Sequence, residues 1–234
     1  MTGSDPIVLQ SVEKNYGGLR PLRIKELRVG QGEFVSLVGF DRPAAETFVN
    51  LVTGATLPDR GEVVVLGKHT QDIVNSDEWL GFVERFGIVS GRIVLLEAMT
   101  VSQNLALSFD LAIDPIPPEV LTKVRRLADE VEIDELDLLK PAAETTPLTR
   151  SRLLLARALA LDPQVLVLEH PSAAIEGDER GRLSHTIKTL CRSRRLTTLC
   201  LTADEPFAKE TGGRLLVWQP ATGEFRQRSS LRFW

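Results

Sequence analysis

A short apolar segment, followed by a glycine and then by an amphipathic segment, constrains this chain more than any other feature. Residues 34–38 are almost all apolar, which predicts a buried strand, and Gly39 follows them directly. Apolar residues then gather between Phe48 and Val52, which predicts a helix that begins near Thr47. A strand, a glycine turn and a helix in this order indicate an α/β protein built on a parallel sheet.

The same segment has the spacing of a phosphate-binding loop but not its residues. In the pattern G-x-x-x-x-G-K-[ST], Gly39 takes the first position. The second glycine, the lysine and the hydroxyl are replaced by Ala44, Ala45 and Glu46. A lysine there would make a charge-assisted contact with phosphate worth about 1.5–3 kcal/mol. Arg42 and Thr47 offer partial compensation, but neither restores the geometry of the motif.

Composition places the chain among ordinary globular proteins. Its 234 residues are 43% hydrophobic and 26% charged, which predicts one large domain with a substantial core. The net charge of -4 argues against non-specific nucleic-acid binding, so the basic runs 192–195 and 226–234 are expected to be solvated surface. Neither a membrane span nor a signal peptide is evident, which predicts a cytoplasmic chain. Cys191 and Cys200 fit no metal spacing. Cys200 is expected to be a buried thiol, and Cys191, at the end of a helix, is expected to be inert.

The remaining segments alternate between strand and helix patterns. Two half-buried strands, 7–12 and 22–29, predict an antiparallel pair with Tyr16 in the turn between them. Further strands are predicted at 86–90, 164–170 and 197–202, with a closing hairpin at 215–218 and 224–226. Helices are predicted at 119–131, 150–161 and 178–192. The stretch from about 92 to 150 therefore reads as a mostly helical insertion.

Three longer segments resemble the ATP-binding cassette of ABC transporters. They are Thr53-Gly-Ala-Thr-Leu-Pro-Asp-Arg-Gly-Glu-Val, Met99-Thr-Val-Ser-Gln-Asn-Leu-Ala-Leu and the run from Ala156 to Pro171. The resemblance covers residues 7 to 228 and implies an α/β fold. That fold would have a P-loop NTPase-like parallel sheet core, an N-terminal antiparallel β subdomain and a helical insertion. It also implies one cassette over 1–234, with a core of 1–91 and 151–234 and a helical subdomain at about 92–150.

Several positions that carry chemistry in that family hold other residues here. The Walker B aspartate and glutamate positions look like Glu169 and His170. Glu169 still offers a carboxylate for a cation, whereas His170 is either a base or a polar residue at a strand end. The switch glutamine position matches Gly91 and the switch histidine position matches Ala203, and neither side chain senses a phosphate.

The loops that complete a nucleotide site in the family are also altered. The glycine-rich signature loop matches Thr145, Thr146, Pro147, Leu148 and Thr149. Of these, Thr146 keeps a hydroxyl where the family has serine, and the absence of glycine restricts close backbone approach to phosphate. The D-loop matches 172–176. Tyr16 matches the aromatic residue that stacks on adenine, or else it is simple turn packing.

These replacements favour a catalytically degenerate ABC cassette over an active ATPase. The resemblance implies an ABC permease subunit and a second cassette as partners, with no nucleic acid, and attachment to the inner face of the membrane only through a partner. The apolar residues 93–96 and Met99 are expected either to meet the permease or to be core. The alternative is a slow ATPase that binds ATP and Mg²⁺ with Arg42, Glu169 and His170.

Overall fold

The N-terminal part of the chain forms an antiparallel sheet, as expected. The computed structural model describes residues 5–227, and the outer part of the predicted basic run 226–234 lies outside them. The sheet has the strand order β2-β1-β4-β5. Its strands are β1 (Ile7–Lys14), β2 (Leu22–Val29), β4 (Arg60–Val65) and β5 (Lys68–His69). Apolar side chains of β1, β2 and β4 pack on one face, which is the pattern that their alternating sequences predict.

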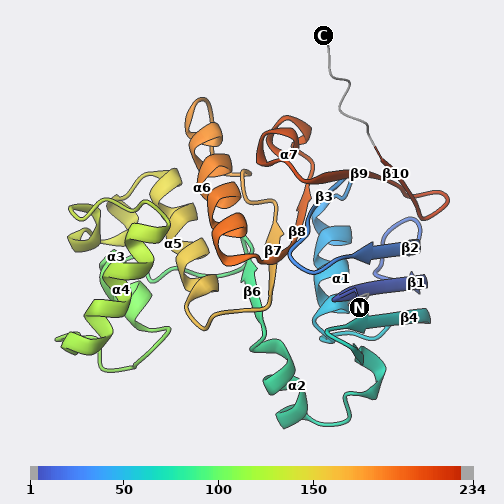
Figure 1. Ribbon diagram of the computed structural model, residues 1–234, viewed down its shortest axis with the longest axis horizontal. Coiled ribbons are helices and arrows are strands. Elements are labelled where there is room, and N and C mark those ends of the chain that lie inside the picture. The colour runs from blue at the N-terminus through green and yellow to red at the C-terminus, as the bar shows by residue number, and fades with distance from the viewer. Residues whose placement is uncertain (1–4, 228–234) are drawn as a thin grey trace.

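A second sheet of six strands lies beside the first and has the order β10-β9-β3-β8-β7-β6 (Figure 1). Its strands are β3 (Phe34–Val38), β6 (Phe86–Val89), β7 (Val165–Glu169), β8 (Thr197–Thr202), β9 (Arg214–Gln219) and β10 (Glu224–Gln227). All neighbours are parallel except β9 and β10, which form the predicted hairpin. Because parallel strands end at one edge, the residues after β3, β7 and β8 are brought together.

Helices cover this sheet and fill the stretch between β6 and α5. The helices are α1 (Arg42–Val52), α2 (Ser76–Val83), α3 (Val101–Ala106), α4 (Pro118–Glu130), α5 (Pro147–Leu159), α6 (Glu179–Arg194) and α7 (Glu205–Thr211). Short 3-10 turns lie at Thr70–Asp72, Asp137–Leu139 and Ala142–Glu144. In Figure 1, α3, α4 and α5 form a helical lobe on the far side of α6 from the antiparallel sheet, and α5 packs against β6 of the parallel sheet. None of the described helices is both long and apolar enough to cross a membrane.

Two hydrophobic cores hold these layers together. One joins the antiparallel sheet to α1 and one face of the parallel sheet, and the other joins that sheet to α3–α6. Cys191 and Cys200 are both buried in the second core, which confirms the buried thiol predicted for Cys200.

Two helices begin earlier than the sequence predicts. Helix α1 begins at Arg42 instead of near Thr47, and α5 begins at Pro147 instead of Arg150. In both, a polar residue caps the first turn: the Asp41 carboxylate accepts a hydrogen bond from the Ala44 amide, and the Thr146 hydroxyl accepts one from the Thr149 amide. Hydrophobic periodicity locates the buried middle of a helix, whereas capping decides its start.

Candidate functional site

The candidate site lies at the carboxyl edge of the parallel sheet. Val38, at the end of β3, pairs with Thr202 of β8, and Glu169, at the end of β7, pairs with Leu201. This register places Gly39, Glu169 and Ala203 at neighbouring strand ends, with the N-terminus of α1 beside them. The fold therefore brings the sequence-predicted Walker positions to one edge.

The N-terminus of α1 is closed by the chain's own groups. The Asp41 carboxylate accepts from the Ala44 amide at 2.9 Å, and the Asp41 carbonyl accepts from the Ala45 amide at 2.9 Å. Pro43, in the first turn, has no amide hydrogen to donate. Helix N-termini attract phosphate through free amides and a partial positive charge. Here a carboxylate already occupies that end and repels a further anion.

The segment between β3 and α1 packs inward as part of the core. Phe40 is buried and stacks on Trp218 with ring centroids 4.4 Å apart, and it meets Phe48 edge to face at 5.6 Å. Ala45, in the lysine position, is also fully buried. A loop anchored by an aromatic ring and a buried methyl group has no room to wrap a phosphate.

Neither compensating residue proposed from the sequence contributes a phosphate ligand in this arrangement. Arg42 is exposed and makes no ion pair or side-chain hydrogen bond with another residue of the described chain. The Thr47 hydroxyl donates to the Pro43 carbonyl at 2.8 Å within its own helix. Both side chains therefore stand apart from the carboxylates at the strand ends.

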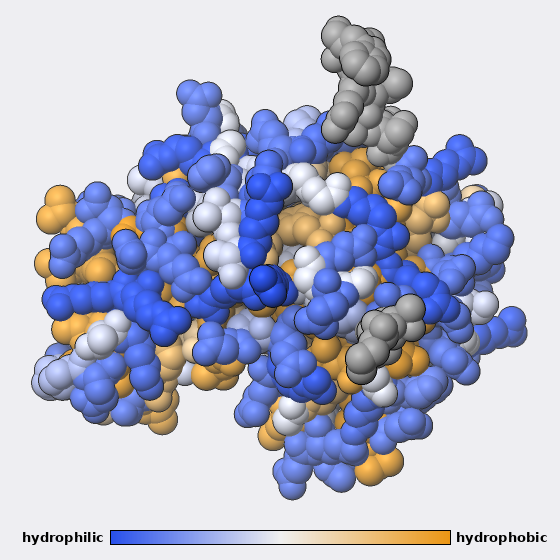
Figure 2. Space-filling view, viewed as in Figure 1, coloured by the Kyte–Doolittle hydropathy of each residue, from blue (hydrophilic) through white to orange (hydrophobic). Residues whose placement is uncertain are grey.

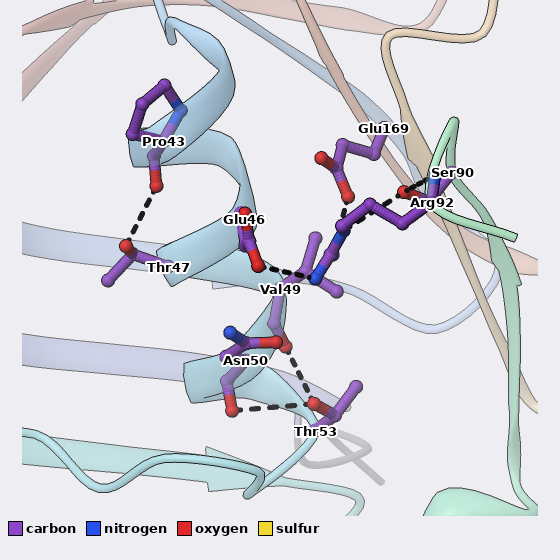
Figure 3. A network of polar contacts seen from close by, with 9 residues as sticks. All are labelled: Pro43, Glu46, Thr47, Val49, Asn50, Thr53, Ser90, Arg92 and Glu169. Carbon is purple, nitrogen blue, oxygen red and sulfur yellow. Dashed lines mark hydrogen bonds and ion pairs between the residues drawn. The ribbon is translucent and has the colours of Figure 1, made fainter. Parts of the chain in front are cut away.

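Arg92 is the residue that organises the site, and the sequence analysis missed it. Its guanidinium donates to Glu46 at 2.9 Å and to Glu169 at 2.7 Å, and its Nε donates to the Ser90 hydroxyl at 3.2 Å. Figure 3 shows the side chain extending from the segment after β6 and joining α1 to the end of β7. The signal was present in the sequence, because a cation directly follows Gly91, the switch position.

The residues present do not fit a nucleotide-bound magnesium ion. Glu169 is only 7% exposed, and its carboxylate is paired with the Arg92 guanidinium at 2.7 Å. A divalent cation at this carboxylate would have to displace that guanidinium, because two cations in contact repel each other. Within residues 5–227, no three His, Cys, Asp or Glu side chains gather into a set that could hold a metal.

His170 occupies an unusual backbone position beside Glu169. Its φ of 47° lies in the left-handed region, and its amide donates to the Leu201 carbonyl at 2.8 Å. Its Nε2 is buried and has no hydrogen-bond partner in the described chain. A general base must reach the water that it activates, whereas this nitrogen is enclosed by protein. The arrangement is that of a residue held at a strand end.

The segment after β8 is joined to the D-loop by a hydrogen bond and to α6 by an ion pair. Ala203 carries no polar group, but the next residue, Asp204, accepts from the Ser172 hydroxyl at 3.0 Å and pairs with Arg180 at 3.2 Å. Asp204 also caps α7 by accepting from the Phe207 amide. The polar groups nearest the switch histidine position are thus bonded to one another.

The signature segment is likewise bonded internally. Thr145 donates to the Ala142 carbonyl, Thr146 caps α5, and Thr149 donates to Asp137 at 3.0 Å. Pro147 opens the helix, and Leu148 is buried in the core of the helical lobe. Every threonine hydroxyl of this segment is therefore already engaged with a neighbouring group.

Tyr16 packs against its own turn. A Cβ on Gly18 would lie 2.8 Å from the tyrosine ring, so glycine is required there for the ring to cover the backbone. Burial, and then the charge of Asp41, raise the pKa of the Tyr16 hydroxyl. The ring is half-buried, and one side of it already meets the protein.

The two sheets, the helices between β6 and β7, and the glycine turn after β3 give the chain the fold of an ABC-type ATP-binding cassette. Solved structures with this fold include the dimeric cassette MJ0796, described as a bacterial ABC transporter cassette. It matches with a TM-score of 0.77 over 97% of this chain and 100% of that chain, at 22% identity. The protein cbiO1 from Clostridium perfringens, described as part of an ABC transporter complex, matches with a TM-score of 0.73 at 19% identity. That match covers 92% of this chain and 84% of cbiO1. The expected fold class is confirmed.

Sequence relatives agree with the fold. The chain is 28% identical over 212 residues to the sulfate/thiosulfate import ATP-binding protein CysA of Thermosynechococcus vestitus, a match over 90% of this chain and 60% of that protein. It is 30% identical over 212 residues to CysA of Nocardia farcinica, covering 90% of this chain and 61% of the relative. No family model matches. The chain thus spans about 60% of the length of these relatives, and its resemblance to ABC transporter ATP-binding subunits is confirmed.

Proposed function

We propose that this chain is a catalytically degenerate ABC cassette that acts as a structural or regulatory partner and does not hydrolyse ATP. One observation carries the proposal: the Arg92 guanidinium is bonded to Glu46 and Glu169 at once. These carboxylates stand at the hydroxyl position of the phosphate loop and at the Walker B position. A group that would meet magnesium in an active site is instead neutralised by the protein.

The charge of the site supports the same proposal. Glu46, Glu169 and the capping Asp41 bring three carboxylates to the site, and Arg92 supplies one paired cation. Mg²⁺-ATP is itself an anion, so its phosphates would approach a region with an excess of negative charge. Arg42 is the remaining cation of the loop, and it makes no contact with these groups.

The segment after β6 supports a role in docking a permease. Leu95 is buried, whereas the neighbouring Val94 is 75% exposed and Leu96 is 41% exposed. The backbone is held firmly: the Asn104 side chain bonds to the Leu96 amide and carbonyl at 2.9 and 3.0 Å, and Arg157 donates to the Val94 carbonyl at 3.1 Å. A rigid segment that presents apolar side chains is typical of a protein interface.

The domain organisation and the partners of the chain belong to the same proposal. We infer one cassette over 1–234, with a core of 1–91 and 151–234 and a helical subdomain at about 92–150. It would sit at the inner face of a membrane through a permease, and pair with a second cassette. The relatives named above are import proteins for sulfate and thiosulfate, which makes an import complex for an inorganic anion the first system to consider.

A phosphate-release assay tests the catalytic part of this proposal. The purified chain is incubated with Mg²⁺-ATP beside Glu169→Gln and His170→Ala variants. We expect no release above the buffer rate for any of the three proteins. Turnover by the wild type that both substitutions abolish would establish the alternative, a divergent ATPase in which Glu169 and His170 carry the chemistry.

A further inference from the structure

A basic cavity lies at the edge of the parallel sheet opposite the degenerate nucleotide site. Its volume is about 760 Å³. It is bounded by the residues that precede or begin strands, including Phe34 at the start of β3 and Gly213 just before β9. Glu169 is the last residue of β7 and Gly39 directly follows β3, so both lie at the other edge of the sheet. The length of a β-strand of about five residues, or roughly 15 Å, therefore separates the two sites.

Three cations line this cavity, and no carboxylate does. The cations are Lys188, Arg192 and Arg195, and the inner wall includes Phe34, Cys191 and Thr211. The interior is thus partly apolar, whereas its rim is positive. Figure 2 shows strongly hydrophilic side chains gathered in the middle of this face, where the C-terminal end of α6 lies in Figure 1.

The three cations have no internal partner. Within residues 5–227, none of them makes an ion pair or a side-chain hydrogen bond. Arg194, on the same turn of α6, behaves differently: it is bonded to Glu130 and to Asp162. At the end of α6, Arg194 is therefore bonded to other parts of the chain, whereas Arg192 and Arg195 line the cavity.

The backbone of Arg195 indicates that its side chain is needed at this place. Its φ and ψ of 52° and 42° put it in the left-handed region at the C-terminal cap of α6. Glycine or asparagine is favoured at such a position, because other residues are strained there. Arg195 is exposed, so it holds an unpaired charge at the rim of the cavity in spite of this backbone strain.

We propose that this cavity binds a small soluble polyanion with two or more phosphate or sulfate groups. Guanidinium groups match these oxyanions with paired hydrogen bonds, and two arginines and a lysine supply charge for more than one group. A volume of about 760 Å³ suits a small organic or inorganic ligand. The site is independent of the proposed loss of nucleotide binding, because it shares no residue with it.

Helix electrostatics provides the competing explanation for Arg192. Cations near a helix C-terminus stabilise the helix, so Arg192 could be present for stability alone. That explanation predicts a lower melting temperature when Arg192 is removed and no effect on a ligand. The same field favours the charge of Arg195 at the C-terminal cap, but there a glycine would relieve the backbone strain, so stability alone does not favour arginine.

Calorimetric titration with inorganic tripolyphosphate, without magnesium and at low salt, tests the proposal. We expect saturable binding to the full chain and an affinity at least tenfold lower in Arg192→Ala and Arg195→Gly. Arg195→Gly is expected to melt at or above the wild-type temperature, which separates lost binding from lost folding. Arg125→Ala removes an exposed, unpaired charge on α4 and should leave the affinity unchanged.

Three results would overturn the proposal. One is the absence of binding at millimolar tripolyphosphate, and another is an equal loss of affinity in Arg125→Ala, which would indicate a diffuse charge effect. The third is binding of the chain to phosphatidylserine vesicles, lost in Arg195→Gly, without any binding of tripolyphosphate. That outcome would assign the three cations to a lipid surface instead of a soluble ligand.

Discussion

Arg92 supplies a cation of the protein itself to two carboxylates of the candidate site. Its guanidinium satisfies a nearly buried carboxylate, Glu169, and reaches Glu46 on the neighbouring helix. Buried carboxylates are costly unless a partner compensates their charge, so the stability of the fold depends on this arginine.

Substitution of Arg92 is therefore expected to destabilise the protein. Arg92→Ala leaves Glu169 unpaired and should lower the free energy of unfolding by about 1–3 kcal/mol in urea titrations. Arg125→Ala, which removes an arginine without a partner, should change it by less than about 0.5 kcal/mol. Equal effects of the two substitutions would contradict the assigned role of Arg92.

The reactivity of the two cysteines tests whether both thiols are buried. Burial raises the pKa of the Cys191 thiol to about 11, and burial raises the pKa of Cys200 further still. Since the thiolate is the reactive form, we expect a disulfide reagent at pH 8 to modify neither cysteine in the native protein and both in urea. Rapid native modification of Cys191 would show that the cavity wall opens.

The residue types in the sequence are enough to show which family residues the candidate site lacks. They are not enough to show that Arg92 joins the carboxylates there. The absence of a lysine, of glycines and of a switch glutamine is visible at single positions. The bridge made by Arg92 is not visible in this way, because its two partners are distant in sequence. Glu46 lies 46 positions before Arg92, and Glu169 lies 77 positions after it. Only the sheet register brings these groups together.

Capping groups define where the two site helices begin. The sequence predicted both α1 and α5 and placed their buried faces correctly, but it missed their first turns, which contain few large apolar residues. Asp41 and Thr146 supply the missing signal. At α1 the early start shortens the loop between β3 and the helix to residues 39–41.

Loss of the cap on α5 should be measurable. Thr146→Ala removes the oxygen that accepts from the Thr149 amide and is expected to cost about 1 kcal/mol of unfolding free energy in urea titrations. Thr145→Ala, one residue before the cap, serves as the matched control and should cost less. A larger effect of the control would contradict the assignment of Thr146 as the capping residue.

The contact between α4 and α6 predicts a pH dependence. The hydrogen bond from Arg194, aided by its charge, holds the pKa of Glu130 below its usual range. A lowered carboxyl pKa contributes stability that is complete above the ordinary range, near pH 4.3, and is lost as pH falls through the lowered value. The stability difference between wild type and Glu130→Gln should therefore shrink on acidification towards pH 3. A difference that is constant in urea titrations from pH 7 to 3 would contradict this contribution.

The molecule as a whole keeps the architecture of a cassette while its motifs have changed. Buried strands, helix periodicity and the order of the segments were enough to predict both sheets and the helical lobe. The basic cavity could not be predicted, because its residues come from three separate regions of the chain. Under the proposed loss of catalysis, we expect the surfaces of the fold to remain in use.

The apolar segment after β6 is the surface with the clearest expected partner. A photoreactive amino acid at Val94, introduced in cells, should cross-link to an integral membrane protein, because this exposed side chain is held on a rigid backbone. The same group at Leu161, which is exposed outside this segment, should not. Cross-linking from both positions, or from neither, would contradict a permease interface at this segment.

Calorimetric titration with Mg²⁺-ATP tests directly whether this chain binds the nucleotide. It is performed on the wild type and on Arg42→Ala, which removes the one unpaired cation of the altered loop. We predict no heat of binding up to millimolar nucleotide for either protein, because Arg92 already occupies the carboxylates and Asp41 closes the helix N-terminus. Micromolar binding by the wild type that Arg42→Ala abolishes would contradict the account and establish a rebuilt nucleotide site.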